Sequence, residues 1–294
     1  MKKLVLASCA KLNLYLNVLA KRADGFHDIE TVFERIDLCD EVGLKLNSSG
    51  LIRVSCLDKA VPQGARNLAF QAAEILKKDF SLKAGVDIQI KKNIPVGSGL
   101  AGGSSNAAAT LLGLNQLLGL RLSRKQLLKY ARILGSDVAF FVLGYRFGLG
   151  RGRGDEIKPL RGIGRFWHLL VVPSVSVSTK SIYQGLNFKS IPDKTEGLTD
   201  SNKDVKMLVR VLKDRDFSGL PRYIHNSLET ETLEKFPEVG QIKDYLRNLG
   251  INTACMSGSG AAVYAILKSR KEAEKYQAVL NQKKDWQTYV VKTR

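Results

Sequence analysis

A glycine-rich stretch that runs directly into an alanine- and leucine-rich segment constrains this chain more than any other feature. Residues 94–118 read IPVGSGLAGGSSNAAATLLGLNQLL. Glycines let backbone N–H groups approach an anion closely, and the first turn of a helix leaves N–H groups unpaired at its positive dipole end. Ser104 and Ser105 stand where hydroxyls can cap the helix or contact a phosphate or its Mg²⁺. No Asp or Glu occurs from Ile88 to Ser136, so the pattern favours a polyphosphate site.

Other readings of this stretch are weaker. Gly97, Gly99 and Gly102 match the dinucleotide fingerprint, but that motif needs an acidic residue about 20 positions further on, where this chain has none. No Gly-Lys-Ser/Thr follows, as a Walker A loop would require. The VAIK, HRD and DFG motifs of protein kinases are missing from the chain. A plain glycine turn capping a helix remains the structural alternative.

The charge balance favours an anionic partner. The chain has 46 Lys and Arg against 28 Asp and Glu, a formal charge of +18. Phosphorylated substrates, nucleic acid and anionic membranes all suit such a surplus, and charge alone does not choose among them. Neither a CxxC pair nor an HExxH motif occurs, so no transition-metal site is expected. The four cysteines are expected to be reduced thiols; they are Cys9, Cys39, Cys56 and Cys255.

The N-terminus resembles an export signal but has the pattern of a strand. MKKLVLASCA has the lysines, apolar run and Leu-Ala-Ser-Cys of a bacterial lipoprotein signal, yet Lys11 follows at once. Ala10–Val18 then alternates polar and apolar residues, which predicts a half-buried strand through the supposed cleavage site. We therefore expect a cytoplasmic protein with no membrane partner, since no run is long enough to cross a bilayer.

Helices and strands mix along the whole chain. A capping box at Ser123 and Gln126 predicts a helix that ends at Gly135. The polar stretch 188–220 is expected to be a surface excursion with a short helical centre. The glycine-rich Gly148–Gly154 suggests a boundary near Arg161, giving domains 1–160 and 161–294. The other expected elements are a helix over Asn67–Lys78 and strands over Leu12–Val18, Val42–Leu46, Leu51–Val54, Val86–Ile90, His168–Pro173 and Ala262–Leu267.

The block from Pro95 to Ala107 resembles the central motif of the GHMP kinases, the family of galactokinase, homoserine kinase and mevalonate kinase. Further blocks, in order, are similar to a branch of that family whose acceptor carries cytidine diphosphate. The resemblance implies an α+β, two-domain GHMP kinase fold, with an N-terminal domain like the second domain of ribosomal protein S5. These blocks are Ala10–Leu14, Arg22–His27, Thr31–Phe33, Leu134–Phe141, Asn226–Glu229 and Met256–Ala261.

The chain departs from the family pattern at several positions. Ser98 and Ala101 stand where the family usually has glycine, and Phe26 replaces a more common tyrosine. Ala23 and Ala139 replace usual prolines. Ala101 matters most, because its Cβ could narrow the phosphate loop. It is tolerated if its φ stays negative.

The resemblance implies phosphoryl transfer from ATP with Mg²⁺. Asp137 would take the proton of the acceptor hydroxyl, and Lys11 would keep Asp137 ionised and stabilise the transferring group. Without the surrounding pattern, Asp137 would be an ordinary acid after a helix and Lys11 a solvated lysine on a strand. Asn67 would help to hold adenine. The implied phosphate-binding residues are Pro95, Gly97, Ser98, Gly99, Leu100, Ala101, Gly102, Gly103, Ser104 and Ser105, with Gly258–Gly260 as a second turn over the phosphates.

The same resemblance assigns the acceptor site. A cytosine ring is planar with polar groups on one edge, so an aromatic sandwich with a polar contact at that edge would select it. Phe26 and Tyr183 would cover its two faces and His27 would meet its edge, while Asn13 would bind the polyol. A core aromatic is the ordinary alternative for Phe26.

Rival functions remain at this stage. Homoserine or mevalonate kinase acceptors lack a base, so the aromatic pair and His27 argue against them. A nucleic-acid-binding protein on the same scaffold would suit the +18 charge but would not need Lys11 and Asp137. No GxSxG elbow supports a serine hydrolase. We expect ATP and a small molecule as partners, no nucleic acid, no resident metal held by the protein alone, and a monomer or weak homodimer.

Overall fold

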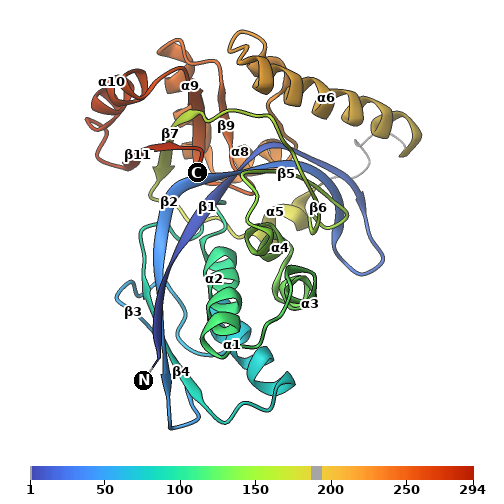
Figure 1. Ribbon diagram of the computed structural model, residues 1–294. Helices are drawn as coiled ribbons and strands as arrows, with labels where there is room; N and C mark the ends of the chain where they lie inside the picture. Colours follow the sequence, from blue (N-terminus) through green and yellow to red (C-terminus); the bar gives the residue numbers. More distant parts are fainter. Residues whose placement is uncertain (1, 187–193) are drawn as a thin grey trace. The chain divides into compact units, whose positions relative to one another are not determined.

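The computed structural model describes residues 2–186 and 194–294, and helices and strands are mixed along the chain as the sequence predicts (Figure 1). In chain order the elements are β1 (Lys3–Lys21), β2 (His27–Asn47), β3 (Ile52–Cys56), α1 (Leu68–Asp79), β4 (Gly85–Lys91), α2 (Gly102–Leu117), α3 (Arg124–Leu134), α4 (Ser136–Leu143), β5 (Phe147–Arg151), β6 (Glu156–Pro159), β7 (Trp167–Pro173), α5 (Thr179–Gly185), α6 (Lys194–Asp214), α7 (Leu220–Tyr223), β8 (His225–Asn226), α8 (Glu229–Lys235), α9 (Pro237–Asn248), β9 (Ala254–Met256), β10 (Val263–Leu267), α10 (Arg270–Leu280) and β11 (Trp286–Lys292).

The chain forms two compact units, and each is made of several separate stretches of the sequence. The first unit holds the residues up to Ala10 together with Leu38–Val96 and Ala101–Tyr145. The second holds Lys11–Asp37, Gly97–Leu100 and the chain from Arg146 onward. Strands β1 and β2 each contribute residues to both units. The domain limits 1–160 and 161–294 stay a prediction.

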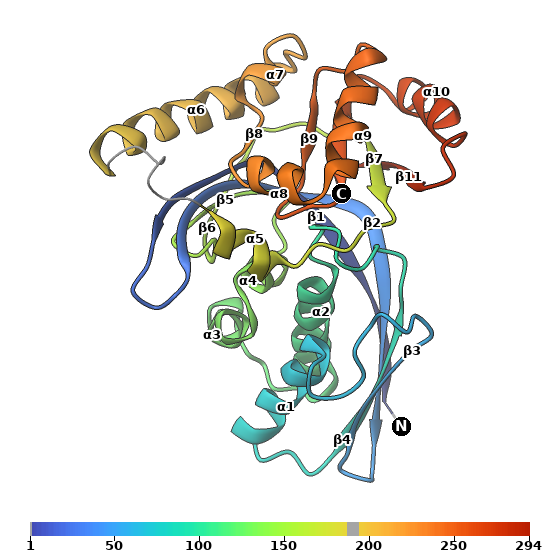
Figure 2. The same cartoon turned by 180° about the vertical axis from the view of Figure 1, so that it is seen from behind.

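The first unit packs helices against a small sheet. In it β4 pairs with β2 in antiparallel register and with β3 in parallel register. Helices α1 and α2 lie side by side (Figure 2), and α4 packs on both α2 and α3. Helix α1 begins where the Asn67 side chain accepts a hydrogen bond from the Ala69 N–H at 2.8 Å. The capping box at Ser123 and Gln126 is confirmed at the start of α3, as is the helix end at Gly135.

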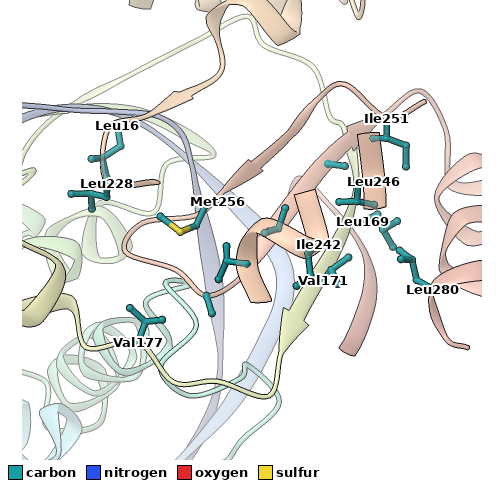
Figure 3. Close-up of a cluster of buried hydrophobic side chains, with 14 of the residues drawn as sticks. Leu16, Leu169, Val171, Val177, Leu228, Ile242, Leu246, Ile251, Met256 and Leu280 are labelled. Carbon is teal, nitrogen blue, oxygen red and sulfur yellow. The ribbon is translucent and has the colours of Figure 1, made fainter. Parts of the chain in front are cut away.

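The second unit is built on an antiparallel sheet in the order β11-β7-β10-β9. Apolar side chains of β7 and α9 meet in its core (Figure 3). In the same unit β5 pairs with β2 and β6, and β8 pairs in parallel with β1. The labelled members of the core are Leu16, Leu169, Val171, Val177, Leu228, Ile242, Leu246, Ile251, Met256 and Leu280.

The last residues of the chain are tied to β2 within this unit. Thr293 bridges to Ile36, and its hydroxyl donates to the Glu34 carboxylate. The same Glu34 oxygen lies 2.8 Å from His168 Nε2, and all three polar side chains are fully buried. The Lys292 N–H donates to Asp37 at 2.8 Å. Removal of one member would strand buried polar groups, which typically costs about 1–3 kcal/mol per group.

Two sequence interpretations of the N-terminal strands are wrong. Strand β1 runs through the supposed cleavage site as predicted, but residues 8–16 are buried on both faces rather than one. The polar residues of its alternating pattern therefore point into protein and not into water. Cys9 and Cys39, expected to be reduced thiols, form a disulfide bond between β1 and β2.

The polar stretch 188–220 contains more helix than expected. Helix α6 has 21 residues instead of a short centre, while residues 188–193 lie outside the described part of the chain. Across residues 2–186 and 194–294, none of the helices has the length and apolar character needed to cross a membrane.

Candidate functional site

The phosphate loop has the backbone of an anion site. Gly97 and Gly99 have φ values of 67° and 76°, and helix α2 begins at Gly102. The first N–H groups of an α-helix have no acceptor within the helix, and its dipole favours negative charge there. No acidic residue lies in the first turn of α2. The N–H groups at the start of α2 are therefore of the kind that binds a phosphate, and phosphate binding here stays a prediction.

Ala101 departs from expectation. The sequence interpretation required a negative φ, whereas the structure gives φ 57° and ψ 34° at the N-cap of α2. In this left-handed region the alanine Cβ lies too close to the following carbonyl oxygen. Ala101 therefore takes a conformation that glycine, the usual residue of the family here, adopts without strain.

The glycines of the loop are needed for different reasons. A Cβ built on Gly99 would lie 2.1 Å from the Ser257 carbonyl oxygen, and one on Gly97 would lie 2.2 Å from Ser176 Oγ. Those two glycines are required by packing inside the protein. Among the described residues, the nearest atom to a Cβ on Gly103 is Leu68 Cδ1, at 3.9 Å. The fold therefore has room for a side chain at Gly103. The lack of a side chain there would instead allow a ligand to approach the backbone closely.

Other predicted ATP-binding residues use their polar groups in the fold. Ser105 Oγ donates to the Cys9 carbonyl at 2.8 Å and accepts from Ser8 Oγ at 2.8 Å. Besides capping α1, Asn67 donates from Nδ2 to the Pro62 carbonyl at 2.7 Å. The contacts of Asn67, Pro95, Ser98, Leu100, Ser104 and Ser105 with ATP stay predictions.

A second glycine turn lies directly against the first. Ser257 Oγ donates to the Gly99 carbonyl at 3.3 Å, and the Ala262 N–H donates to the Ser98 carbonyl at 3.0 Å. The family resemblance implies that Gly258–Gly260 contact the same phosphates, although about 160 residues separate the two turns. Their proximity is a finding, and their joint contact with phosphates stays a prediction.

Lys11 is held in place beside these turns. Its ammonium donates to the Gly99 carbonyl at 3.0 Å and to the Asn13 side-chain oxygen at 2.5 Å. It also lies 5.9 Å from the centre of the Phe33 ring. Only 3% of Lys11 is exposed, so the alternative of a solvated strand lysine is wrong. A buried lysine so directed can neutralise charge on a phosphoryl group.

Asp137 lies in the first turn of α4, and Gly135 precedes that helix. Negative charge interacts favourably with the N-terminal end of a helix dipole. Lys11 and Asp137 belong to different compact units. Their pairing stays a prediction.

The residues expected to read a base come partly together. The rings of His27 and Tyr183 lie 5.0 Å apart, centre to centre, with 31° between their planes. Phe26 is 50% exposed, so a core aromatic is excluded, and the Arg153 guanidinium lies 4.7 Å from its ring centre. Burial, followed by the charge of Lys21, lowers the pKa of His27, which favours the neutral imidazole.

Sequence reasoning missed several residues at this site. Asn226 is buried, and its Nδ2 donates to the carbonyls of Met256 at 2.8 Å and Gly258 at 2.7 Å, thereby holding the second glycine turn. Thr31 contacts Asn13, and Arg153 covers Phe26. Asn226 and Thr31 belong to the family blocks Asn226–Glu229 and Thr31–Phe33. These blocks indicated that the segments belong to the site, but not which residues Asn226 and Thr31 contact. No sequence pattern distinguished Arg153 from other surface arginines.

A clustered protein metal site does not occur in the described residues, where no three His, Cys, Asp or Glu side chains gather around one point. Mg²⁺ commonly binds through substrate phosphates, waters and one or two protein oxygens. The serine hydroxyls and backbone groups at the phosphate loop are oxygen and N–H groups of the kind that suit a metal–polyphosphate complex.

The match to family models defines the class of protein. Residues 67–145 match the GHMP kinases N terminal domain, and residues 208–285 match the GHMP kinases C terminal domain. Together with the glycine loop at the start of α2, these matches make the chain a GHMP kinase.

Similarity to individual proteins is more specific. The chain is 41% identical over 267 residues to 4-diphosphocytidyl-2-C-methyl-D-erythritol kinase of Geobacillus kaustophilus, covering 90% of this chain and 89% of the relative. It is 39% identical over 294 residues to the Geobacter metallireducens protein of the same name, covering 100% and 99%. A crystal structure of 4-(cytidine 5'-diphospho)-2C-methyl-D-erythritol kinase matches with a TM-score of 0.79 and 29% identity, covering 98% of this chain and 99% of that one. The chain belongs to this kinase family.

Proposed function

We propose that the protein transfers the γ-phosphoryl group of ATP to the 2-hydroxyl of 4-diphosphocytidyl-2-C-methyl-D-erythritol, a step of the non-mevalonate route to isoprenoid precursors. The observation that carries this proposal is the buried Lys11, directed by Gly99 and Asn13 beside two glycine turns, in a chain similar over its whole length to such kinases. Phosphoryl transfer needs this kind of fixed positive charge near the reacting phosphate.

ATP would bind with its phosphates on the loop 97–105. The N–H groups at the start of α2 would hold the phosphate oxygens, and Gly103 would allow their close approach. Mg²⁺ would arrive as the ATP complex, held mainly by the phosphates, and would neutralise their charge. Asn67 would contribute to the adenine site.

Asp137 and Lys11 would carry the chemistry. The Asp137 carboxylate would accept the proton of the 2-hydroxyl as its oxygen bonds to the γ-phosphorus and the bond to the β-phosphate oxygen breaks, releasing ADP. The Lys11 ammonium would stabilise negative charge on the transferring group. Asn13, next along the same buried face of β1, would hydrogen-bond the polyol.

Three residues would select the cytosine. Phe26 and Tyr183 would stack on the base, and His27 would meet its polar edge as the neutral imidazole that its lowered pKa favours. Because His27 lies against one face of Tyr183, the base would use the other face or displace the imidazole. Acceptors of homoserine and mevalonate kinases have no base to use these rings.

ADP release with a panel of acceptors tests the proposal. We expect turnover with 4-diphosphocytidyl-2-C-methyl-D-erythritol and much less with its uridine analogue, methylerythritol phosphate, homoserine or mevalonate. Equal use of the cytidine and uridine compounds would refute the assigned acceptor, and turnover only with homoserine or mevalonate would favour another GHMP kinase. We further propose a cytoplasmic monomer or weak homodimer that needs no nucleic acid, which size-exclusion chromatography and activity without nucleic acid would test.

A further inference from the structure

Thr31 is a fully buried residue of β2 whose hydroxyl links β2 to the site on β1. Thr31 Oγ1 donates to the Tyr15 carbonyl at 2.7 Å. The same oxygen accepts a hydrogen bond from Asn13 Nδ2, also at 2.7 Å. A hydroxyl has one proton, and a carbonyl can only accept. The bond to Tyr15 therefore fixes the Thr31 oxygen as an acceptor toward Asn13.

This polarity decides which way the Asn13 amide faces. With Nδ2 directed to Thr31, Oδ1 is directed to the Lys11 ammonium, which is the arrangement in the structure. The reverse orientation would set Nδ2 against the ammonium and Oδ1 against the acceptor oxygen of Thr31. The contact with Lys11 would then join two donors, and the contact with Thr31 would join two acceptors. Lys11 and Thr31 therefore allow only one orientation of the Asn13 amide.

The backbone of Asn13 is fixed as well. Its carbonyl accepts a hydrogen bond from the Tyr264 hydroxyl at 3.0 Å, and its N–H donates to Ser257 Oγ at 3.3 Å. The side-chain amide is thus the adjustable group at this position, and Thr31 determines it. Lys11 in turn donates to the Asn13 side chain and to the Gly99 carbonyl.

We propose that Thr31 is a positioning residue for phosphoryl transfer, which acts through the orientation of the Asn13 amide on the direction of the Lys11 ammonium. The inference rests on the proposed function, in which Lys11 stabilises the transferring group. Thr31 touches neither ATP nor the acceptor in this scheme. Thr31 acts through three consecutive hydrogen bonds, and the Tyr15 carbonyl, which can only accept, sets the donor and acceptor roles in all of them.

Two substitutions of similar size separate this role from packing. Thr31→Val keeps the shape and removes the hydroxyl, whereas Thr31→Ser keeps the hydroxyl and removes a methyl group. We expect Thr31→Val to lower kcat by about 10- to 100-fold, as a misdirected catalytic group does, with the KM for ATP nearly unchanged. Thr31→Ser should retain most of the kcat, although loss of the buried methyl lowers its thermal midpoint.

A double-mutant cycle tests the route of the effect. In Asn13→Asp the two carboxylate oxygens are equivalent, so an oxygen faces Lys11 whichever way the group turns. We expect Asn13→Asp to have a lower kcat of its own, but adding Thr31→Val to it should reduce kcat by less than threefold. A reduction as large as that in the wild-type background would refute the proposed route through Asn13.

The outcomes distinguish this inference from the proposed function. An inactive wild-type enzyme with the cytidine-diphosphate acceptor would contradict the function. An active wild type, with a Thr31→Val variant that folds by circular dichroism and has the wild-type kcat, would overturn the positioning role while leaving the function intact. A lower melting temperature of Thr31→Val with unchanged kcat would likewise show a structural role only.

Discussion

Ala101→Gly should make this protein more stable, although most substitutions in a phosphate loop would be expected to harm it. Ala101 has φ 57° and ψ 34°, a left-handed conformation that glycine adopts more readily than alanine. The left-handed region costs a non-glycine residue about 1–2 kcal/mol. Glycine avoids that cost but gives the unfolded chain more freedom, which offsets about 0.4–1 kcal/mol. The expected net gain in the free energy of unfolding is therefore about 0.8 kcal/mol, the middle of a range of about 0–1.6 kcal/mol.

Urea denaturation followed by circular dichroism measures this gain as a higher midpoint at an unchanged slope. Arg121→Gly is a matched control, because Arg121 is exposed and also has φ 57°. Both variants should gain stability to a similar extent. Only Ala101→Gly should also lower the KM for ATP, since it alone removes a Cβ from the phosphate loop.

A gain of stability in Arg121→Gly together with a loss in Ala101→Gly would contradict this prediction. That result would mean that the Ala101 side chain contributes more by packing than its backbone conformation costs. Ala101→Val provides a test in the opposite direction. A β-branched side chain in this region is a stronger outlier than alanine, so this variant should be less stable than the wild type.

The remaining predictions concern the reaction and its specificity. Asp137→Asn should lower kcat by roughly 10²–10⁴ in the ADP-release assay with little change in the KM for ATP, and a near-normal kcat would exclude Asp137 as the base. Gly103→Val should fold, because its Cβ would meet only Leu68 Cδ1, at 3.9 Å, and calorimetry should show weaker ATP binding; unchanged affinity in a folded variant would make the loop merely structural. His27→Ala should lose most of the preference for the cytidine over the uridine acceptor, whereas an unchanged preference would remove His27 from base recognition. Because the pKa of His27 is lowered, its imidazole should be neutral from about pH 7 upward, and the wild-type KM for the acceptor should be constant there. The KM should increase only as the pH falls below about 6.5. An increase in KM that begins as the pH falls from 8 to 7 would contradict a neutral His27.

Local features of the fold could be predicted from the sequence because short-range chemistry determines them. The capping box at Ser123 starts α3, and the glycine loop starts α2, since the signals for both lie within a few residues of the helix end. The family blocks likewise indicated two glycine turns, and the structure brings Gly99 against Ser257.

The interior of the site could not be predicted in the same way. Lys11 and Asn13 alternate with apolar residues, which ordinarily indicates a solvent face. Their burial is compatible with hydrogen bonds to Thr31, Gly99 and Ser257, which lie far from them in the sequence. The Cys9–Cys39 disulfide depends on which residues face one another across β1 and β2. The sign of φ at Ala101 depends on the turn as a whole, since the residue type alone favours a negative value.

The attachment of the C-terminal residues to β2 has a consequence for how the protein is made. Glu34, Ile36 and Asp37 leave the ribosome early, but their partners at Lys292 and Thr293 are synthesised about 260 residues later. At bacterial and eukaryotic translation rates this interval is roughly 13–50 s. Throughout that time the Glu34 carboxylate lacks its Thr293 hydroxyl, so these contacts of the second unit form only after Lys292 and Thr293 have been synthesised. A chain that lacks Lys292 and Thr293 would therefore leave Asp37 and Glu34 on β2 without these hydrogen bonds.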